Sequence, residues 1–317
     1  MGTYTKVTML NNFMEKLRML REVKTLEEAV SLYSEVGMPA RNYSEATRKH
    51  YASDLGLFVE YMREQGITEI AEIDLTDLES YQAQMDREGY AASTRNRKTH
   101  AIKSFFTFMR RQKVIAHDPS EELIPPSPNK DEPRFLTEAE YNRLLRAVSH
   151  NPRDAAIIEL FLQTGMRLSE LARLTLSDVT LPGKITKDAE NMGVVRVRRK
   201  GGRFETIPLN YKACKAIAAY LKVRPSVPHN GLFVTKFKKH MGKRSVQNVV
   251  KKYLEEAGID EAHTHTLRHT HATHHAAKGT DLKVIQENLG HASLKTTSIY
   301  VSLAKESQRK ALQENAL

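Results

Sequence analysis

The chain has 317 residues, 49 lysines and arginines against 38 aspartates and glutamates, and a single cysteine, which gives a formal net charge of +11. This length predicts two domains, and one cysteine excludes an intrachain disulfide, a cysteine-based zinc finger and an iron–sulfur cluster. No apolar run approaches the ~18 residues of a membrane span, and a signal-peptide pattern is missing, so we expect a cytoplasmic protein. The basic excess predicts a polyanionic partner, either nucleic acid or an anionic membrane surface.

Residues 1–41 carry apolar side chains at helical spacing, between Leu10 and Tyr33, before the sequence Gly37-Met38-Pro39 interrupts the pattern. We expect this segment to form an N-terminal helical arm. Its role is left open between an additional DNA contact and a contact between protomers.

Residues 42–118 predict a compact all-helical domain, because apolar residues recur every three and four positions and glycines separate the periodic runs. The third helix, with Ser93 as its expected N-cap, has no acidic residue between Arg95 and Lys113. Such a basic helix is typical of a DNA-binding surface. The cations expected to contact DNA here are Arg95, Arg97, Lys98, Lys103, Arg110 and Arg111.

A proline-rich segment at 119–134 predicts an extended linker, with four prolines between positions 125 and 133. A second domain at 135–300 begins with Thr137 and Glu140, whose spacing is that of a helix capping box. It is expected to be helical apart from a β-hairpin around 194–207, where Lys200-Gly201-Gly202 forms the turn. Residues 301–317 predict a short helical tail.

Three separated motifs in the second domain are chemically unusual. In Thr164-Gly165-Met166-Arg167, the arginine comes at the start of a helix, an unfavourable place for a cation unless an anion joins it there. An ion pair with Glu170 on the surface is the alternative explanation. The second motif places His265 and Arg268 on one helical face, where they are suited to bind and polarise a phosphate without a metal.

A metal site is the rival interpretation of the second motif, because His271 and His275 have the i, i+4 spacing of zinc ligands. A third ligand is not evident, and Ala272 stands where the glutamate of an H-E-x-x-H motif would be. Packing or solvated roles are the simpler expectation for His263, His271, His274 and His275. The third motif ends at Tyr300, a residue type that attacks phosphorus only when its proton is removed and its oxyanion is stabilised.

Taken together, TGMRLSEL at 164–171, Lys200 in the hairpin, HTLRHTHAT at 265–273 and LGHASLKTTSIY at 289–300 resemble the tyrosine recombinase (phage integrase) family, in particular its Xer-type bacterial members. The intervals of three, twenty-three and nine residues that separate His265, Arg268, His291 and Tyr300 agree as well. The resemblance implies a mainly α fold, with a small helical DNA-binding domain and a larger, mostly helical catalytic domain that carries a small antiparallel sheet.

The resemblance also implies how the scissile DNA phosphate would be held. Arg167 and Arg268 would bind its non-bridging oxygens, and His291 would donate a further hydrogen bond. Glu170 matches an acidic position that braces this cluster. Cations can neutralise the charge of the phosphoryl transition state without a metal, so neither a metal nor another cofactor is expected.

The remaining roles concern protons and the nucleophile. Tyr300 would attack phosphorus to give a 3′-phosphotyrosine and a free 5′-hydroxyl, with His265 assisting transfer of the tyrosine proton. Lys200 would protonate the departing 5′-oxygen. The neighbouring Arg199 is an alternative donor, but Lys200 is preferred because it directly precedes the Gly-Gly turn.

The expected partner is double-stranded DNA carrying recombination sites, bound by a homo-tetramer and without contact to a membrane; the need for accessory proteins is left open. A type IB topoisomerase-like enzyme and a non-catalytic architectural DNA-binding protein are the alternatives. The sequence does not choose between resolution of replicon dimers, resolution of plasmids or transposons, and integration. A second basic segment is expected to contact DNA through Lys236, Lys238, Lys239, Lys243 and Arg244.

Overall fold

The computed structural model describes residues 23–127, 132–188, 190–199, 202–290 and 299–305. It separates into two compact units between Asp131 and Glu132, inside the segment expected to be a linker. Each unit is described by itself. In the described ranges, no helix is long and apolar enough to cross a membrane.

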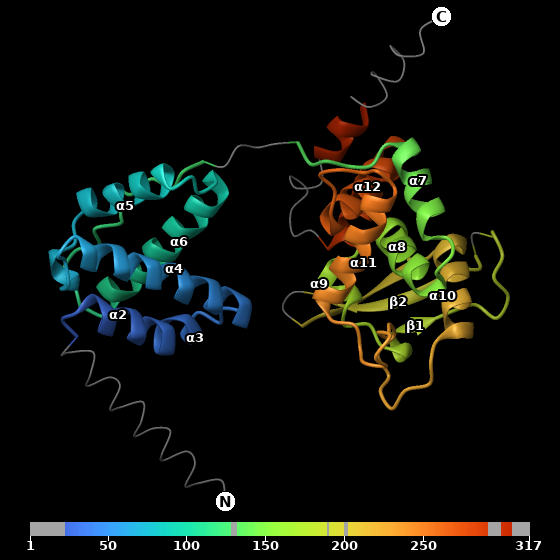
Figure 1. The fold of residues 1–317 in the computed structure, drawn as a ribbon, viewed down its shortest axis with the longest axis horizontal. Helices are drawn as coiled ribbons and strands as arrows, with labels where there is room; N and C mark the ends of the chain where they lie inside the picture. The colour runs from blue at the N-terminus through green and yellow to red at the C-terminus, as the bar shows by residue number, and fades with distance from the viewer. Residues whose placement is uncertain (1–22, 128–131, 189, 200–201, 291–298, 306–317) are drawn as a thin grey trace, which may run out of the picture. The chain divides into compact units, whose positions relative to one another are not determined.

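In the described residues of the first unit, all the regular elements are helical (Figure 1). Its elements are α2 (Leu26–Leu32), the π-helical turn η1 (Tyr33–Gly37), α3 (Met38–Ala40), α4 (Glu45–Glu64), the 3₁₀ turn η2 (Ile70–Glu72), α5 (Leu75–Arg87) and α6 (Ala92–Arg111). Thr25, Ser44 and Asp74 cap the starts of α2, α4 and α5 through their side-chain oxygens. The expected N-cap at Ser93 is wrong by two residues, because α6 begins at Ala92 after Ala91.

The core of this unit includes the end of the segment expected to be an arm. Leu26, Tyr33 and Met38 are buried in the same cluster as Phe58 and Phe105 from α4 and α6. The hydroxyl of Tyr33 lies 2.7 Å from Oγ of Ser104, which adds a polar link to α6. Residues 26–40 are therefore a component of the helical domain, whereas residues 1–22 lie outside the described ranges.

The second unit surrounds a small sheet with helices (Figure 1). Its elements are α7 (Glu138–Val148), α8 (Pro152–Thr164), α9 (Leu168–Leu171), η3 (Leu176–Asp178), β1 (Val179–Thr180), β2 (Gly193–Arg198), β3 (Phe204–Leu209), α10 (Tyr211–Val223), α11 (Lys243–Glu256), α12 (Thr264–Ala277) and α13 (Leu282–Leu289). The capping box of Thr137 and Glu140 is confirmed, as is the β2–β3 hairpin. The short antiparallel β1 beside β2 was not predicted.

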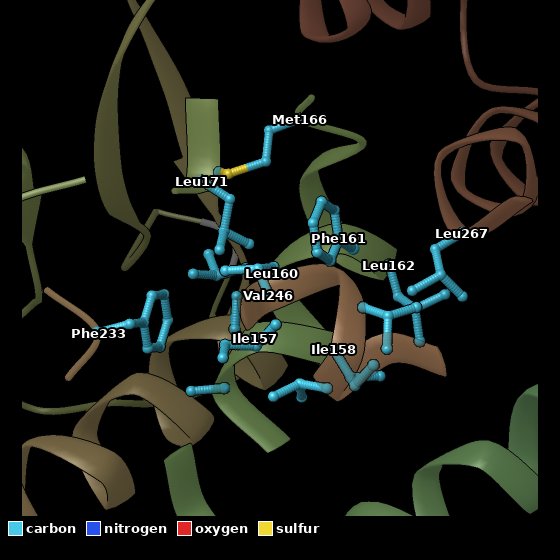
Figure 2. Packing of buried hydrophobic residues seen from close by; sticks show 14 of the residues in the cluster. Ile157, Ile158, Leu160, Phe161, Leu162, Met166, Leu171, Phe233, Val246 and Leu267 are labelled. Atoms are coloured by element: carbon cyan, nitrogen blue, oxygen red, sulfur yellow. The ribbon is translucent and has the colours of Figure 1, made fainter. Parts of the chain in front are cut away.

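Helix α8 forms the centre of the second core. Its residues Ile157, Ile158, Leu160 and Phe161 are all buried, so the helix is apolar on more than one face and packs against several neighbours, as Figure 2 shows. The helix ends at Gly165, whose φ of +62° is left-handed. The turn that follows this fixed helix leads directly into Arg167.

The tight turn after α8 also explains why a glycine stands there. A Cβ atom on Gly165 would lie 2.7 Å from Cδ2 of His271 and 2.8 Å from Cδ2 of Leu289. The left-handed backbone and the close approach of α12 and α13 both require a residue without a side chain. The end of α8, α12 and the end of α13 consequently meet at one place.

Candidate active site

Arg167 begins helix α9 and is held by Glu170. The backbone N–H of Arg167 donates to Oε2 of Glu170 at 2.8 Å, and its Nη1 donates to Oε1 at 2.9 Å. Its Nη2 donates to the carbonyl of Gly290 at 2.9 Å. A guanidinium has five N–H donors, so this anchored and partly exposed side chain keeps donors for another acceptor.

Arg268, on α12, is only 4% exposed. Its Nη1 donates to the carbonyl of Gly165 and its Nη2 to that of Leu289, each at 2.6 Å. Burial, together with the charge of Arg167, lowers the pKa of Arg268 to about 10, so it remains a cation at neutral pH. The two arginines thus donate to adjacent carbonyls at the end of α13. Two motifs that are about 100 residues apart in the sequence meet there.

Tyr300 is 2% exposed and packs in a small apolar cluster with Ala272, Ile285 and Leu289. Its hydroxyl lies 2.9 Å from Nδ1 of His269. Burial raises the pKa of Tyr300, and the nearby charge of Arg268 opposes that rise. The structure therefore brings the expected nucleophile to the arginine that is expected to hold its target.

His269 was not singled out from the sequence. Burial lowers its pKa to about 4, so at neutral pH the imidazole is uncharged and accepts the tyrosine proton in a hydrogen bond when its own proton is on Nε2. A signal was present, because His269 follows Arg268 and lies one helical turn after His265. The sequence motifs indicate His265 alone for proton transfer.

The side chain of His265, in the first turn of α12, is partly exposed to solvent. Partial burial and the charges of His263, Arg268 and Arg167 lower its pKa, which places it in the same electrostatic environment as the two arginines. Lys200 and His291, the other expected catalytic residues, lie outside the described ranges.

Arg199, weighed above as a donor to the leaving group, is instead buried. Its Nη1 donates to Oε2 of Glu170 at 2.9 Å, and its Nε donates to Oε2 of Glu205 at 2.8 Å. Its Nη2 donates to the carbonyls of Asn288 and Glu287, at 2.7 and 3.2 Å. These bonds direct the guanidinium inward, so Arg199 does not suit the donor role.

The remaining histidines of α12 have structural partners. Nδ1 of His271 lies 3.0 Å from the carbonyl of Leu162, and Nε2 of His274 lies 2.9 Å from that of Leu136. In the part of the chain that the structure describes, no group of three or more histidine, cysteine or acidic residues is arranged to hold a metal ion. The packing interpretation therefore accounts for these two side chains.

Several cations of α6 are committed to the fold of the helical unit. Lys98 is 3% exposed and lies 3.3 Å from Asp54, so it does not reach the surface. Lys103 donates to the carbonyls of Glu121 and Leu123 at 3.0 and 2.8 Å. Three further side chains form ion pairs with acidic residues: Arg95, Arg97 and Arg110.

The basic segment 236–244 of the catalytic unit is different. An antiparallel bridge between Val234 and His240 forms a small loop ahead of α11. Lys236, Lys238 and Lys239 are exposed on that loop, and the side chains of Lys243 and Arg244 are exposed at the start of α11. These cations are oriented toward solvent, as a DNA-contacting surface requires.

Comparison with known proteins agrees with this geometry. The model of the Phage integrase family matches residues 134–307, and that of the phage integrase N-terminal SAM-like domain matches residues 32–113. The chain belongs to the phage integrase family. It is a site-specific tyrosine recombinase, an enzyme that cuts and rejoins DNA. The topoisomerase-like and architectural alternatives are thereby set aside.

Individual relatives cover most of the chain. It is 30% identical to tyrosine recombinase XerC of Bacillus subtilis, over 90% of this chain and 95% of that protein. Identity with tyrosine recombinase XerD of Bifidobacterium longum is 34%, over 84% and 89%. Among solved structures, XerH bound to its palindromic difH substrate matches with a TM-score of 0.72 at 22% identity, over 89% of this chain and 83% of that one, which shows a shared fold.

Proposed function

We propose that Arg167 and Arg268 bind the scissile phosphate and that Tyr300 attacks it. One observation carries this proposal: the two guanidinium groups converge on the adjacent carbonyls of Gly290 and Leu289, and Tyr300 lies within electrostatic reach of Arg268. Each guanidinium uses two of its five N–H donors in the bonds described, so donors remain for the non-bridging oxygens of a phosphate.

The reaction then needs no external energy source. The oxygen of Tyr300 forms a bond to phosphorus while the bond to the 5′-oxygen of DNA breaks, and the phosphotyrosine ester retains the bond energy for rejoining. The arginines neutralise the charge on the equatorial oxygens, a task that metal ions perform in many nucleases. His265 and His269 would accept the tyrosine proton, Lys200 would protonate the 5′-oxygen, and His291 would donate to the phosphate.

Binding of DNA would also have to uncover the nucleophile. Tyr300 is 2% exposed here and its hydroxyl is bonded to His269. Because in-line attack requires contact between this hydroxyl and phosphorus, we propose that DNA displaces the helical segment 299–305, which carries Tyr300.

The domain roles follow the same proposal. Residues 42–118, with the buried part of 1–41, form the core-binding domain, 119–134 the linker, 135–300 the catalytic domain and 301–317 a tail that contacts a neighbouring protomer. Four protomers on two duplex sites, acting in the cytoplasm, would complete strand exchange. A structural neighbour, λ integrase, is described as a dimer bound to a core site, at 18% identity.

Covalent trapping tests the mechanism. A binding site is first selected from random duplexes with the full chain, and a nick beside the cleavage position then lets the short 5′-hydroxyl fragment diffuse away. We expect wild type to accumulate a DNA adduct in EDTA and Tyr300→Phe to form none. Arg268→Ala should lose about 10²–10³-fold in rate, as expected when charge stabilisation of the transition state is removed. The matched control is Tyr141→Phe, which removes a partly buried hydroxyl bonded to Gln163 and should leave the adduct intact. An adduct with Tyr300→Phe would refute the assignment.

A further inference from the structure

Arg199 follows strand β2 and is 7% exposed, although it carries a full charge. A buried guanidinium is tolerated only when acceptors satisfy its donors. Four N–H groups of Arg199 are used, toward Glu170, Glu205 and the carbonyls of Glu287 and Asn288. With its donors directed inward, Arg199 is not placed to contact DNA.

Glu170 connects Arg199 to the phosphate-binding site. Its carboxylate, 3% exposed, accepts from Nη1 of Arg167 at Oε1 and from Nη1 of Arg199 at Oε2, both at 2.9 Å. A carboxylate with both oxygens accessible to one arginine forms a two-bond, fork-like pair with it. Oε2 also accepts from the backbone N–H of Arg167 at 2.8 Å. Arg199 therefore takes the remaining acceptor position on Oε2, which a second N–H of the Arg167 guanidinium would need for such a pair.

The end of α13 fixes the same arrangement from the other side. Arg199, Arg268 and Arg167 donate in turn to the carbonyls of residues 287–288, 289 and 290. Gly290 lies directly against Arg199, since a Cβ atom there would be 2.9 Å from Nε and Cζ of the guanidinium. Three cations face the carboxylates of Glu170 and Glu205, so the cluster has an excess of one positive charge for one phosphodiester.

We propose that Arg199 is a positioning residue for Arg167: by holding the second oxygen of Glu170, it prevents a two-bond Arg167–Glu170 pair and keeps the remaining donors of Arg167 directed at the scissile phosphate. The proposal rests on the phosphate-binding role proposed for Arg167. Because Arg199 acts inside the protein, its loss affects the rate of cleavage and not the affinity for DNA.

The test uses the full-length chain, the selected DNA site and single-turnover cleavage of the nicked substrate. We expect Arg199→Met to cleave at least ~10-fold more slowly while its DNA dissociation constant stays within ~2-fold of wild type. Arg199→Lys keeps the charge but not the fork, and should recover part of the rate. Arg153→Met is the matched control: it removes a partly buried ion pair with Asp154 at the opposite end of α8, roughly 20 Å along that helix, and should cleave at the wild-type rate.

Two further measurements separate positioning from a merely structural role. Arg167→Ala/Arg199→Met should be no slower than Arg167→Ala alone, because Arg199 acts through Arg167. A substrate with sulfur in place of the bridging 5′-oxygen has a leaving group that needs no proton, and Arg199→Met should remain equally slow on it. If Arg199→Met does not fold stably, the same comparisons of cleavage rate and DNA affinity are made with Arg199→Lys.

Three results would overturn the proposal: an unchanged rate in both Arg199 variants, a loss of affinity that matches the loss of rate, or full rescue by the sulfur substrate, which would assign Arg199 to the leaving group. Failure of the phosphate-binding role proposed for Arg167 would give a different result from failure of the positioning role proposed for Arg199. If Arg167→Ala cleaves normally, the phosphate-binding role of Arg167 is wrong, whereas a slow Arg167→Ala with a normal Arg199→Met refutes this inference alone.

Discussion

Helix α6 of the helical unit and the segment 236–244 of the catalytic unit carry similar runs of positive charge, yet the structure uses them differently. In α6, Lys98 is buried against Asp54 and Lys103 caps the carbonyls of a loop. In segment 236–244 of the described chain, the lysine side chains are exposed and none forms an ion pair. One basic run therefore contributes to folding and the other is available to DNA.

The difference arises from what each run is packed against. One side of α6 faces the core of the helical unit and the other faces solvent, so a lysine on the inner side must find a carboxylate such as Asp54. The loop ahead of α11 is bounded by a single bridge and has no core of its own. Charge patterns in a sequence thus indicate a binding surface only where the backbone leaves the side chain in water.

The largest effect that separates the two regions is expected from Lys98→Met. This change leaves Asp54 with one cationic partner fewer in a buried site, and breaking a buried pair costs about 3–5 kcal/mol. Urea unfolding of the full chain should show this loss, and Arg111→Met, at an exposed position of the same helix, should change stability by less than ~0.5 kcal/mol. Equal stability of the two variants would mean that the buried Lys98 contributes no more to folding than an exposed cation of the same helix.

Acidification should lower the stability of the catalytic unit through two buried histidines. The pKa values of His269 and His271 are lowered to about 4 and about 3 by burial, below the 6.5 of an exposed histidine. Below pH 6.5 the unfolded chain therefore binds protons that the folded chain does not, and stability falls as the pH falls. Between pH 7.5 and 5.5 the loss should be about 1.4 kcal/mol for each histidine.

Urea unfolding at the two pH values measures this loss, and His271→Gln serves as its control. The variant lacks one of the two titrating groups, so it should lose roughly half of the pH dependence attributed to the pair. An unchanged pH dependence would show that His271 takes up its proton in the folded chain as readily as in the unfolded chain, contrary to its burial.

The smallest effect on stability, but a clear one on DNA binding, is expected from Lys236→Ala/Lys238→Ala/Lys239→Ala. Removing three phosphate contacts should reduce the slope of log affinity against log salt by about 2.7, at ~0.9 per contact, with a change in stability of less than ~0.5 kcal/mol. Titration of a labelled duplex at several salt concentrations measures the slope. Lys49→Ala, at an exposed lysine of α4 paired with Glu45, is the control and should leave it unchanged.

Much of the fold could be predicted because its signals are local. Thr137 and Glu140 start α7 within four residues, and the alternation in 194–207 specifies the hairpin. The two-residue strand β1 carries no such pattern, since it is defined by its pairing with Val194 and Val195. The N-cap of α6 was misplaced because Ser93, a favourable capping residue, lies one residue inside the helix.

The site was predicted in its parts but not in its connections. Motifs indicated Arg167, Arg268 and Tyr300, which the fold brings together. The hydrogen bond from Tyr300 to His269 spans 31 residues, and that from Arg199 to Glu170 spans 29, so neither follows from local spacing. Burial of Lys98 likewise depends on Asp54, which belongs to another helix. Such partners are decided by tertiary packing.

The end of α13 has a consequence for cooperativity. A helix of eight residues is too short to be stable alone in water, and the last carbonyls of a helix have no partners within it. Here those carbonyls accept from three arginines of other elements. Local fraying of α13 would release all three guanidinium groups together, so the amide-exchange protection of this one helix should report whether the cleavage site is assembled, even where the rest of the catalytic unit stays folded.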